Sequence, residues 1–271
     1  MAAGKTGYDI LGNLALMKFK PGEKAGRKRK AAERILKKNK AVKTVLEKTG
    51  KFKGRLRKQE TKWVAGEKTK EALYRENGCV FRFNIDKVYF SSRLSNERKE
   101  IAQKVKQGDQ VLVMFAGAAP FSIAIARNSG AAKVYSNEMN KEANKYGKMN
   151  IQLNNVKNRV VMLDGDIKNI AKKIADGLLI KNVKAPKKFD VIVMPRPQLK
   201  DSFLREAFML SKKGTRIFYY DFCKEDEIHG IVDKVKSSAR KYHKKIKILK
   251  TKKAGDIAPY RYRVRVDIKV L

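Results

Sequence analysis

Cysteine and histidine are scarce in this sequence of 271 residues. Two cysteines, Cys79 and Cys223, are too few for a disulfide framework and indicate a reducing compartment. Two histidines, His229 and His243, are too few for a usual zinc site, so we expect no metal. No apolar run approaches the ~20 residues that cross a membrane, and the first residues lack the pattern of a signal peptide. The sequence therefore predicts a soluble, cytoplasmic protein that does not bind membranes.

Acidic residues are also scarce. The chain has 65 lysines and arginines against 27 aspartates and glutamates, a formal net charge of +38. The excess is uneven, because positions 17–62 hold 19 basic and 4 acidic residues and positions 233–269 hold 14 and 3. Such a charge favours a polyanionic partner, since phosphates release counterions when cations bind them. A lysine-rich surface adapted to salt or heat is the alternative, and the uneven distribution favours nucleic acid over it.

Regular alternation of strands and helices begins after Phe90 and is typical of a parallel sheet covered on both faces. We expect strands at 111–115, 133–137, 159–163, 190–194, 216–221, 245–250 and 261–270, and helices at 97–105, 121–127, 140–153, 167–175, 201–210 and 225–240. The earlier part is mixed, with a strand pair or one bent strand at 8–19 around Gly12, a helix at 24–39 and short strands at 42–46, 51–57, 62–65 and 79–83. The sequence predicts a small basic α+β domain at 1–88 and an α/β domain at 89–271.

The stretch QVLVMFAGAAPFS, residues 110–122, has the pattern of a buried strand, a turn of small residues and a helix that begins at Pro120. Residues 116–119 carry no side chain larger than a methyl group, so a ligand can approach the backbone. Because Gly117 stands alone, the GxGxxG pattern of dinucleotide sites is missing. Glu138, after the next strand, is placed to accept hydrogen bonds from ribose hydroxyls, and the turn at 164–166 is placed to meet an adenine. S-adenosylmethionine, which has no pyrophosphate, fits this pattern best.

Both acidic assignments have a structural alternative. Glu138 is otherwise a solvated loop acid, and we favour the ribose role from its position. For the turn at Asp164–Asp166, the sequence supports a cofactor-binding role and a purely structural role equally.

A longer stretch resembles a known family. ENGCVFRFNIDKVYFSSRLSNER, residues 76–98, followed by VLVMFAGAAPFSIAIA, resembles the archaeal and eukaryotic tRNA (guanine37-N1)-methyltransferases. The resemblance extends to GRLR at 54–57, WVAGE at 63–67, FYYDF at 218–222 and YRYRVRVDIKV at the carboxyl end. It implies a class I, Rossmann-like α/β methyltransferase fold and an archaeal member without the extra amino-terminal domain of longer relatives. It also implies a monomer that binds the anticodon stem-loop of tRNA.

The chemistry of that reaction sets requirements for the site. Guanine N1 carries a proton that a base must accept, while negative charge develops on O6. The resemblance places the base on Glu97 and the O6-stabilising cation on Arg57. Arg93, four residues before Glu97, is expected to share its helical face and to orient it or bind a phosphate. Tyr89 and the following Phe90 are expected to line the pocket of the flipped base.

Further residues follow from the positions of the motifs. The cofactor-binding residues that we expect are Phe115, Ala116, Gly117, Pro120, Phe121, Glu138, Met139, Asp164, Gly165, Asp166, Met194 and Pro195. The substrate-binding residues that we expect are Arg57, Tyr89, Arg93, Pro195, Arg196 and Pro197.

Two positions depart from the family pattern. Ala119 replaces a glycine, so its methyl group is expected to narrow the approach to the cofactor, and Val113 replaces an aspartate. In the loop at 194–197, Met-Pro-Arg-Pro stands where many members have an asparagine, so backbone carbonyls or Arg196 are expected to contact guanine.

Two other functions remain open at this stage. One is a wyosine-pathway enzyme that transfers an aminocarboxypropyl group from the same cofactor to tRNA. The other is a noncatalytic RNA-binding protein that retains the cofactor fold.

Overall fold

The computed structural model describes residues 7–50, 54, 59–195, 201–224 and 227–271. The chain divides into two units, Met1–Ser92 and Arg93–Leu271. We describe each unit by itself.

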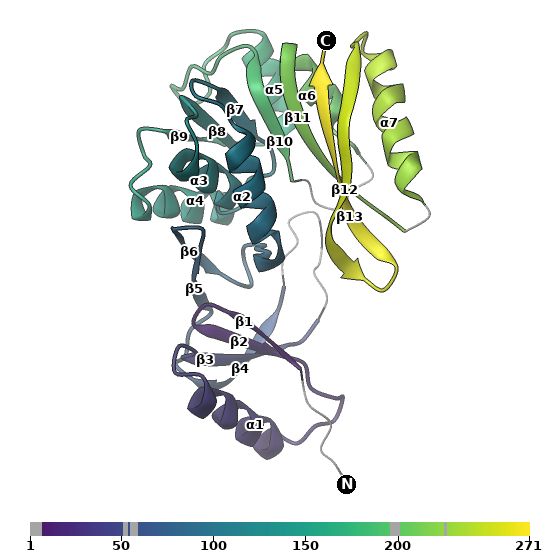
Figure 1. Ribbon diagram of the computed structural model, residues 1–271. Coiled ribbons are helices and arrows are strands. Elements are labelled where there is room, and N and C mark those ends of the chain that lie inside the picture. The colour runs from purple at the N-terminus through teal and green to yellow at the C-terminus, as the bar shows by residue number, and fades with distance from the viewer. Residues whose placement is uncertain (1–6, 51–53, 55–58, 196–200, 225–226) are drawn as a thin grey trace. The chain divides into compact units, whose positions relative to one another are not determined.

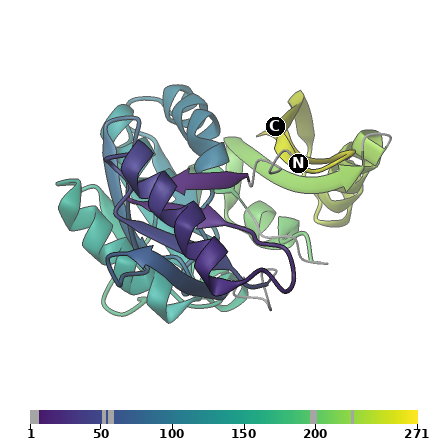
Figure 2. The ribbon, with the colours of Figure 1, turned by 90° about the horizontal axis from the view of Figure 1, so that it is seen from below.

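The first unit contains a four-stranded sheet in the order β1, β2, β3 and β4. These strands are β1 (Tyr8–Leu11), β2 (Leu14–Met17), β3 (Thr44–Lys48) and β4 (Thr61–Gly66). Strands β2 and β3 are parallel, and the helix α1 (Ala25–Lys38) makes the crossover that parallel neighbours require. Helix α1 lies along this sheet (Figures 1 and 2), where Ala32 and Ile35 pack on buried side chains of β2, β3 and β4.

A hairpin of β5 (Glu71–Glu76) and β6 (Cys79–Asn84) completes this unit. The turn between β1 and β2 packs directly on β5. Gly12 has φ +59°, and a Cβ atom there would lie 1.9 Å from the carbonyl oxygen of Leu73, so only glycine fits. Asn13 accepts a hydrogen bond of 2.7 Å from the Leu73 amide and donates one of 3.1 Å to the Glu71 carbonyl.

The second unit is built on a seven-stranded sheet in the order β12, β13, β11, β10, β7, β8 and β9 (Figure 1). The parallel strands are β7 (Gln110–Val113), β8 (Lys133–Glu138), β9 (Val160–Asp164), β10 (Phe189–Met194) and β11 (Ser211–Lys224). Strand β13 (Arg261–Val270) runs antiparallel to β11 and to β12 (Ile246–Ala258). The parallel, Rossmann-like α/β sheet predicted from the sequence is confirmed.

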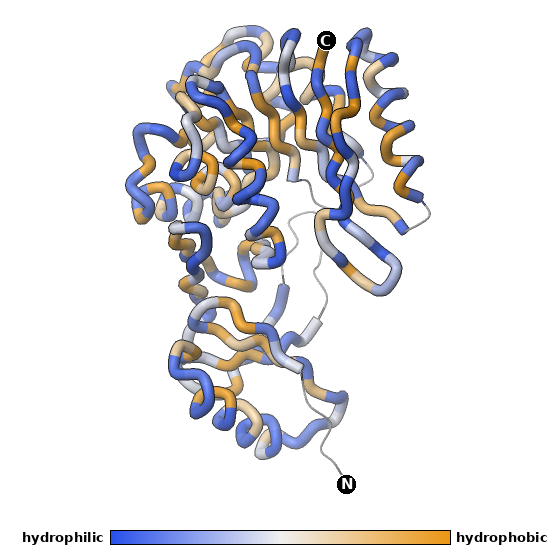
Figure 3. The backbone as a smooth tube through the Cα atoms, in the orientation of Figure 1, coloured by the Kyte–Doolittle hydropathy of each residue, from blue (hydrophilic) through white to orange (hydrophobic). Residues whose placement is uncertain are grey.

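Helices fill the connections between these strands. A 3₁₀ turn η1 (Ser92–Leu94) leads into α2 (Ser95–Lys104), which comes before β7. The other helices are α3 (Pro120–Asn128), α4 (Lys141–Leu153), α5 (Ile167–Ala175), α6 (Leu204–Met209) and α7 (Ile228–Lys241). Apolar side chains of α5, α6 and α7 form one buried cluster with the strands. Strand β10 is hydrophobic along most of its length, whereas α7 alternates between polar and apolar turns (Figure 3). None of the helices described is long and apolar enough to cross a membrane.

The structure differs from these expectations at several elements. Strand β7 ends at Val113, because Phe115 has φ +56°. Helix α6 begins at Leu204 rather than 201, since Phe203 has φ +57° and its amide donates to the side chain of Asp201. Strand β5 was not expected, and β12 continues to Ala258 rather than ending at 250. The strand expected at 51–57 lies outside the described residues, apart from Gly54.

Candidate functional site

The carboxyl ends of β10, β7, β8 and β9 form one continuous edge of the second unit's sheet. The chain runs from β7 to β8 and β9 on one side, and β10 lies on the other side of β7. Ligands of open α/β sheets bind at such a reversal of strand order, because the loops there leave a crevice. All of the expected cofactor-binding residues end or follow one of these four strands, so the fold brings them to the same edge.

The turn between β7 and α3 has an unusual backbone. Phe115, Gly117 and Ala119 have φ values of +56°, +58° and +66°, so alternate residues are left-handed. Pro120 occupies the first turn of α3, where its missing amide costs no hydrogen bond. This conformation is strained for residues other than glycine and indicates a functional constraint on the turn.

Ala119 is fully buried, and its methyl group faces helix α4. A Cβ atom placed on Gly147 would lie 3.8 Å from the Ala119 Cβ atom, an ordinary packing distance. The methyl group therefore occupies space beside a glycine of α4.

Glu138 ties the neighbouring loops together. Its Oε2 accepts a hydrogen bond of 2.8 Å from the Gly117 amide, and its Oε1 accepts one of 2.7 Å from the Asn140 amide. Its carbonyl oxygen accepts a 2.8 Å hydrogen bond from the Gly165 amide. Burial raises the pKa of the Glu138 carboxyl, and the backbone amide donors oppose that rise. A buried carboxylate is thus held against the small-residue turn.

Asp164 presents an acceptor without a partner at the end of β9. Its Oδ2 lies 3.1 Å from both Lys148 Nζ and Lys181 Nζ, whereas its buried Oδ1 has no hydrogen bond in the described part of the chain. Asp166 instead caps α5, because its side chain accepts from the Lys168 amide at 3.0 Å. The two carboxylates of this turn therefore differ, because Asp166 caps a helix whereas Asp164 holds a buried oxygen without a partner among the described residues.

The remaining expected cofactor residues vary in exposure. Phe121 is buried in α3, Met139 is exposed after β8, and Met194 is buried at the end of β10. Pro195 follows β10 and is partly buried. Arg196 and Pro197, expected to bind substrate, lie outside the described residues, as does Arg57.

Glu97 lies in the first turn of α2 and is 5% exposed. Its Oε2 accepts hydrogen bonds of 2.8 Å from the Tyr220 hydroxyl and 2.6 Å from Arg265 Nη1. Its Oε1 lies 2.7 Å from Lys252 Nζ. Burial and the adjacent Glu97 charge raise the pKa of Tyr220 well above its ordinary value. Glu97 is therefore held by three side chains from β11, β12 and β13.

Three carboxylates surround Arg265. Besides Glu97, its guanidinium donates to Glu100 Oε1 at 2.5 Å and to Asp267 Oδ1 at 2.6 Å. The hydrogen bond from Arg265, aided by Lys252, lowers the pKa of Glu100 from 4.5 to about 2. This cluster joins α2 to the last two strands of the sheet.

The expected relation between Arg93 and Glu97 is wrong in one respect. Arg93 lies in η1 and is exposed, whereas α2 begins two residues later, so the two residues do not share an α-helical face. Tyr89 is partly buried before η1. Its neighbour Phe90 stacks on Phe83 of β6 with ring centroids 4.5 Å apart, in the aromatic core of the first unit.

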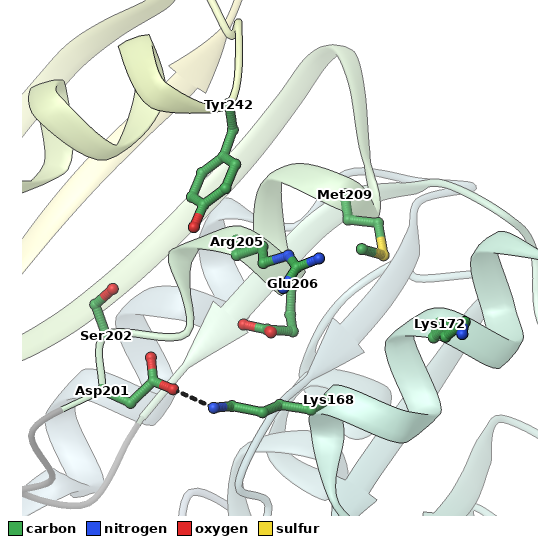
Figure 4. Close-up of a pocket in the computed structure, with 8 residues that line it drawn as sticks. All are labelled: Lys168, Lys172, Asp201, Ser202, Arg205, Glu206, Met209 and Tyr242. Atoms are coloured by element: carbon green, nitrogen blue, oxygen red, sulfur yellow. Dashed lines mark ion pairs between the residues drawn. The ribbon is translucent and has the colours of Figure 1, made fainter.

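A pocket of about 330 Å³ lies on the side of the sheet covered by α5, α6 and α7 (Figure 4). Lys168 and Asp201 form a 2.6 Å ion pair across it. Burial raises the pKa of Glu206, which is only 6% exposed. The lining residues are Lys168, Lys172, Asp201, Ser202, Arg205, Glu206, Met209 and Tyr242. The lining mixes acidic and basic side chains. It does not include the small-residue turn found at the carboxyl edge of the sheet.

Several residues of the site were not expected from the sequence. Asn137 donates to the carbonyls of Leu163 and Gly165 at 2.9 and 3.0 Å, and Asn150 donates to that of Ala118 at 3.1 Å. Asn137 was visible as a polar residue inside the strand VYSNE. Tyr220 and Arg265 lie inside motifs that carry the family resemblance, but nothing local marks them as partners of Glu97, which is far away in the sequence.

Comparisons with known proteins agree on one family. Residues 72–249 match the family model of the TRM5/TYW2 methyltransferase domain. The tRNA (guanine(37)-N(1))-methyltransferase Trm5b of Pyrococcus abyssi is 34% identical over 266 residues, which is 98% of this chain and 75% of that protein. Its crystal structure matches with a TM-score of 0.81 and 32% identity over 98% of this chain and 75% of that one. The structure of aTrm5 in complex with tRNALeu matches with a TM-score of 0.80 and 27% identity, over 98% and 72%.

Proposed function

Because this chain belongs to the TRM5/TYW2 methyltransferase family, we propose that it transfers a methyl group from S-adenosylmethionine to N1 of guanine 37 in tRNA. The observation that carries the proposal is the contact between the small-residue turn and Glu138 at the edge where strand order reverses. The similar Trm5b, matched over 98% of this chain, supports the reaction and the nucleobase. The net charge of +38 supports a nucleic-acid substrate.

The residues at this edge fit S-adenosylmethionine, which supplies an electrophilic methyl group when bound. Its ribose hydroxyls and adenine amino group are hydrogen-bond donors. Glu138 holds a carboxylate beside the turn, and the buried Oδ1 of Asp164 lacks a partner among the described residues. A buried acceptor without a donor is costly, so a ligand that donates to it is favoured. Ala116 and Gly117 leave room for the ligand against the backbone.

Glu97 is the group that we assign to accept the N1 proton, as the family resemblance implies. In the structure both of its oxygens are already engaged, by Tyr220, Arg265 and Lys252. Oε2 accepts from both Tyr220 and Arg265, whereas Oε1 contacts Lys252 alone among the described residues and keeps a lone pair, so displacement of Lys252 would open Oε1 further to a nucleobase proton. Lys252 is suited to this, because its side chain is 28% exposed and already lies 2.6 Å from Glu100 Oε2. Arg265, with a fully buried side chain, then keeps Glu97 in place.

Substrate binding is assigned to residues from both units. We propose that Arg57 stabilises charge on O6, that Tyr89 and Arg93 contact the target nucleotide, and that Pro195, Arg196 and Pro197 contact guanine. Residues 1–88 would add phosphate contacts and 89–271 would hold the reaction centre, in a monomer of the archaeal cytoplasm that uses no metal. The target base has to leave the anticodon-loop stack, which costs a few kcal/mol.

One experiment tests the reaction directly. Purified protein is incubated with unmodified tRNA transcript and labelled S-adenosylmethionine, and the modified nucleoside is identified by mass spectrometry. We expect 1-methylguanosine at position 37 and no product when that guanosine is replaced by adenosine. A nucleoside heavier by an aminocarboxypropyl group would assign the chain to the other reaction. Absence of cofactor binding with intact tRNA binding would contradict both enzyme functions.

A further inference from the structure

The turn between β12 and β13 places an aromatic side chain in solvent. The strands pair from Ile246 and Val270 to Ala258 and Arg261, so Pro259 and Tyr260 alone form the turn. Tyr260 is 76% exposed. Burial against this chain therefore does not account for its large ring.

The backbone at Tyr260 also disfavours this residue type. Tyr260 has φ +55° and follows a proline, which is the pattern of a type II turn. That position normally takes glycine or asparagine, because a side chain with a Cβ atom is strained there. A tyrosine in a strained, exposed position indicates a role outside the fold.

The sheet topology places this turn at the edge of the candidate site. Strand β11 is parallel to β10 and ends at Lys224, which pairs with Arg261 of β13. The turn at Tyr260 therefore projects beyond the carboxyl end of β11, on the same edge as the turn at Gly117. Lys252, also on β12, contacts Glu97 at 2.7 Å, so this hairpin reaches the reaction centre.

The surroundings of the turn are basic and irregular. Lys253 lies 4.0 Å from the ring centroid of Tyr262, and Arg261 is exposed next to Tyr260. The pairing register shifts twice between Lys253 and Ala258, around Gly255 at φ +124°. Such bulges re-aim the end of a hairpin and are common next to active sites.

We propose that Tyr260 is a nucleobase-stacking site, on which an unpaired base of the tRNA anticodon loop lies while a neighbouring guanine is in the reaction centre. Every base offers a flat face to an aromatic ring, and flanking cations bind the phosphates. The inference rests on the proposed function, because it takes its RNA from that reaction. It adds a contact that selects for unstacked rather than double-stranded RNA.

The test uses a substitution whose effects on folding and on binding have opposite signs. Tyr260→Gly relieves the strained backbone, so we expect an equal or higher melting temperature. Its dissociation constant for unmodified tRNA transcript, measured by fluorescence anisotropy, is expected to rise about tenfold, the effect of losing one stacked base. Tyr260→Phe keeps the ring and is expected to bind within about twofold of the wild type. Leu249→Ala, which removes another exposed apolar side chain of β12, is the matched control and is expected to change nothing.

Salt dependence separates stacking from charge. The ratio of dissociation constants between Tyr260→Gly and the wild type is expected to stay constant between low and high salt, whereas Arg261→Ala is expected to reduce the salt slope. If the wild type methylates tRNA and Tyr260→Gly binds tRNA within twofold of the wild type, the stacking inference is overturned and the proposed function stands. Failure of the wild type to bind tRNA would overturn the proposed function as well. Calorimetry with S-adenosylmethionine is expected to give equal affinity for all variants.

Discussion

Arg265 donates a 2.6 Å hydrogen bond from its Nη1 to Oε2 of Glu97, although 168 residues separate them in the sequence. Their side chains are 0% and 6% exposed, so this ion pair is buried. Because Glu100 and Asp267 share the same guanidinium, one cation from β13 contacts three carboxylates. The position of the proposed base therefore depends on the last strand of the chain.

Replacing Arg265 is expected to destabilise the fold strongly. Arg265→Met leaves three carboxylates close together without their shared cation, which costs about 3–5 kcal/mol of unfolding free energy. Urea denaturation measures this loss. Arg261→Met, at an exposed position of the same strand, is the control and is expected to change stability by less than about 0.5 kcal/mol. A loss below 1 kcal/mol for Arg265→Met would show that the cluster is not held as described.

Glu97→Gln is expected to separate binding from chemistry. The amide keeps the shape of the side chain but cannot accept the N1 proton, so single-turnover methyl transfer falls about 10²–10⁴-fold. Affinity for tRNA and for S-adenosylmethionine is expected to stay within about twofold, measured by anisotropy and calorimetry. Glu33→Gln, at an exposed position of α1, is the control and keeps its activity. Full activity of Glu97→Gln would remove Glu97 from the mechanism.

Glu100 is expected to make stability depend on acidity. Its pKa is lowered to about 2 in the folded chain, from 4.5, so the folded state favours the carboxylate. The contribution of the Glu100 carboxylate to the unfolding free energy is fully present above about pH 5 and is lost as the pH falls towards about 2. We expect the gap in unfolding free energy between the wild type and Glu100→Gln to narrow over this window. A gap that stays constant in denaturant titrations across these pH values would contradict the assignment.

Glu206 is expected to make stability depend on pH with the opposite sign to Glu100. Burial raises its pKa, so the folded state favours the protonated form and stability falls as the pH rises above about 4. Glu206→Gln removes this cost and is expected to raise the melting temperature at neutral pH. Calorimetry at pH 7 and pH 4 measures the gain, which is expected to vanish at the lower pH. The exposed Glu33→Gln on α1 is the control, and an equal gain there would refute the effect.

Much of the fold was predictable because its signals are local. Runs such as 111–113 and 191–193 are apolar on both faces, which is typical of central parallel strands, and both lie in the sheet. Once those strands are placed, the residues that follow them have to meet at one edge. The shared location of Gly117, Glu138 and Asp164 was therefore expected from strand order alone.

Other features depend on contacts that no local pattern carries. Strand β5, EALYRE, has three charged residues and only one buried residue, so it lacks the pattern of a strand. It forms because it pairs with β6 and contacts Gly12. The extension of β12 pairs a lysine-rich segment with a buried strand, so its own composition does not indicate a strand. Tyr220 and Arg265 contact Glu97 only through the fold, and the family resemblance named the glutamate without its partners.

Strand β12 stands at one end of the strand order, so its outer backbone groups face no further strand in the described chain. A bare sheet margin of this kind can template intermolecular pairing. Lys247, Lys250 and Lys253 are exposed along it, and their mutual repulsion keeps a second copy away. Concentrated salt screens that repulsion. The high salt that removes bound RNA from this protein is thus expected to let it self-associate. Purification therefore has to remove RNA at high salt and concentrate the protein at low salt.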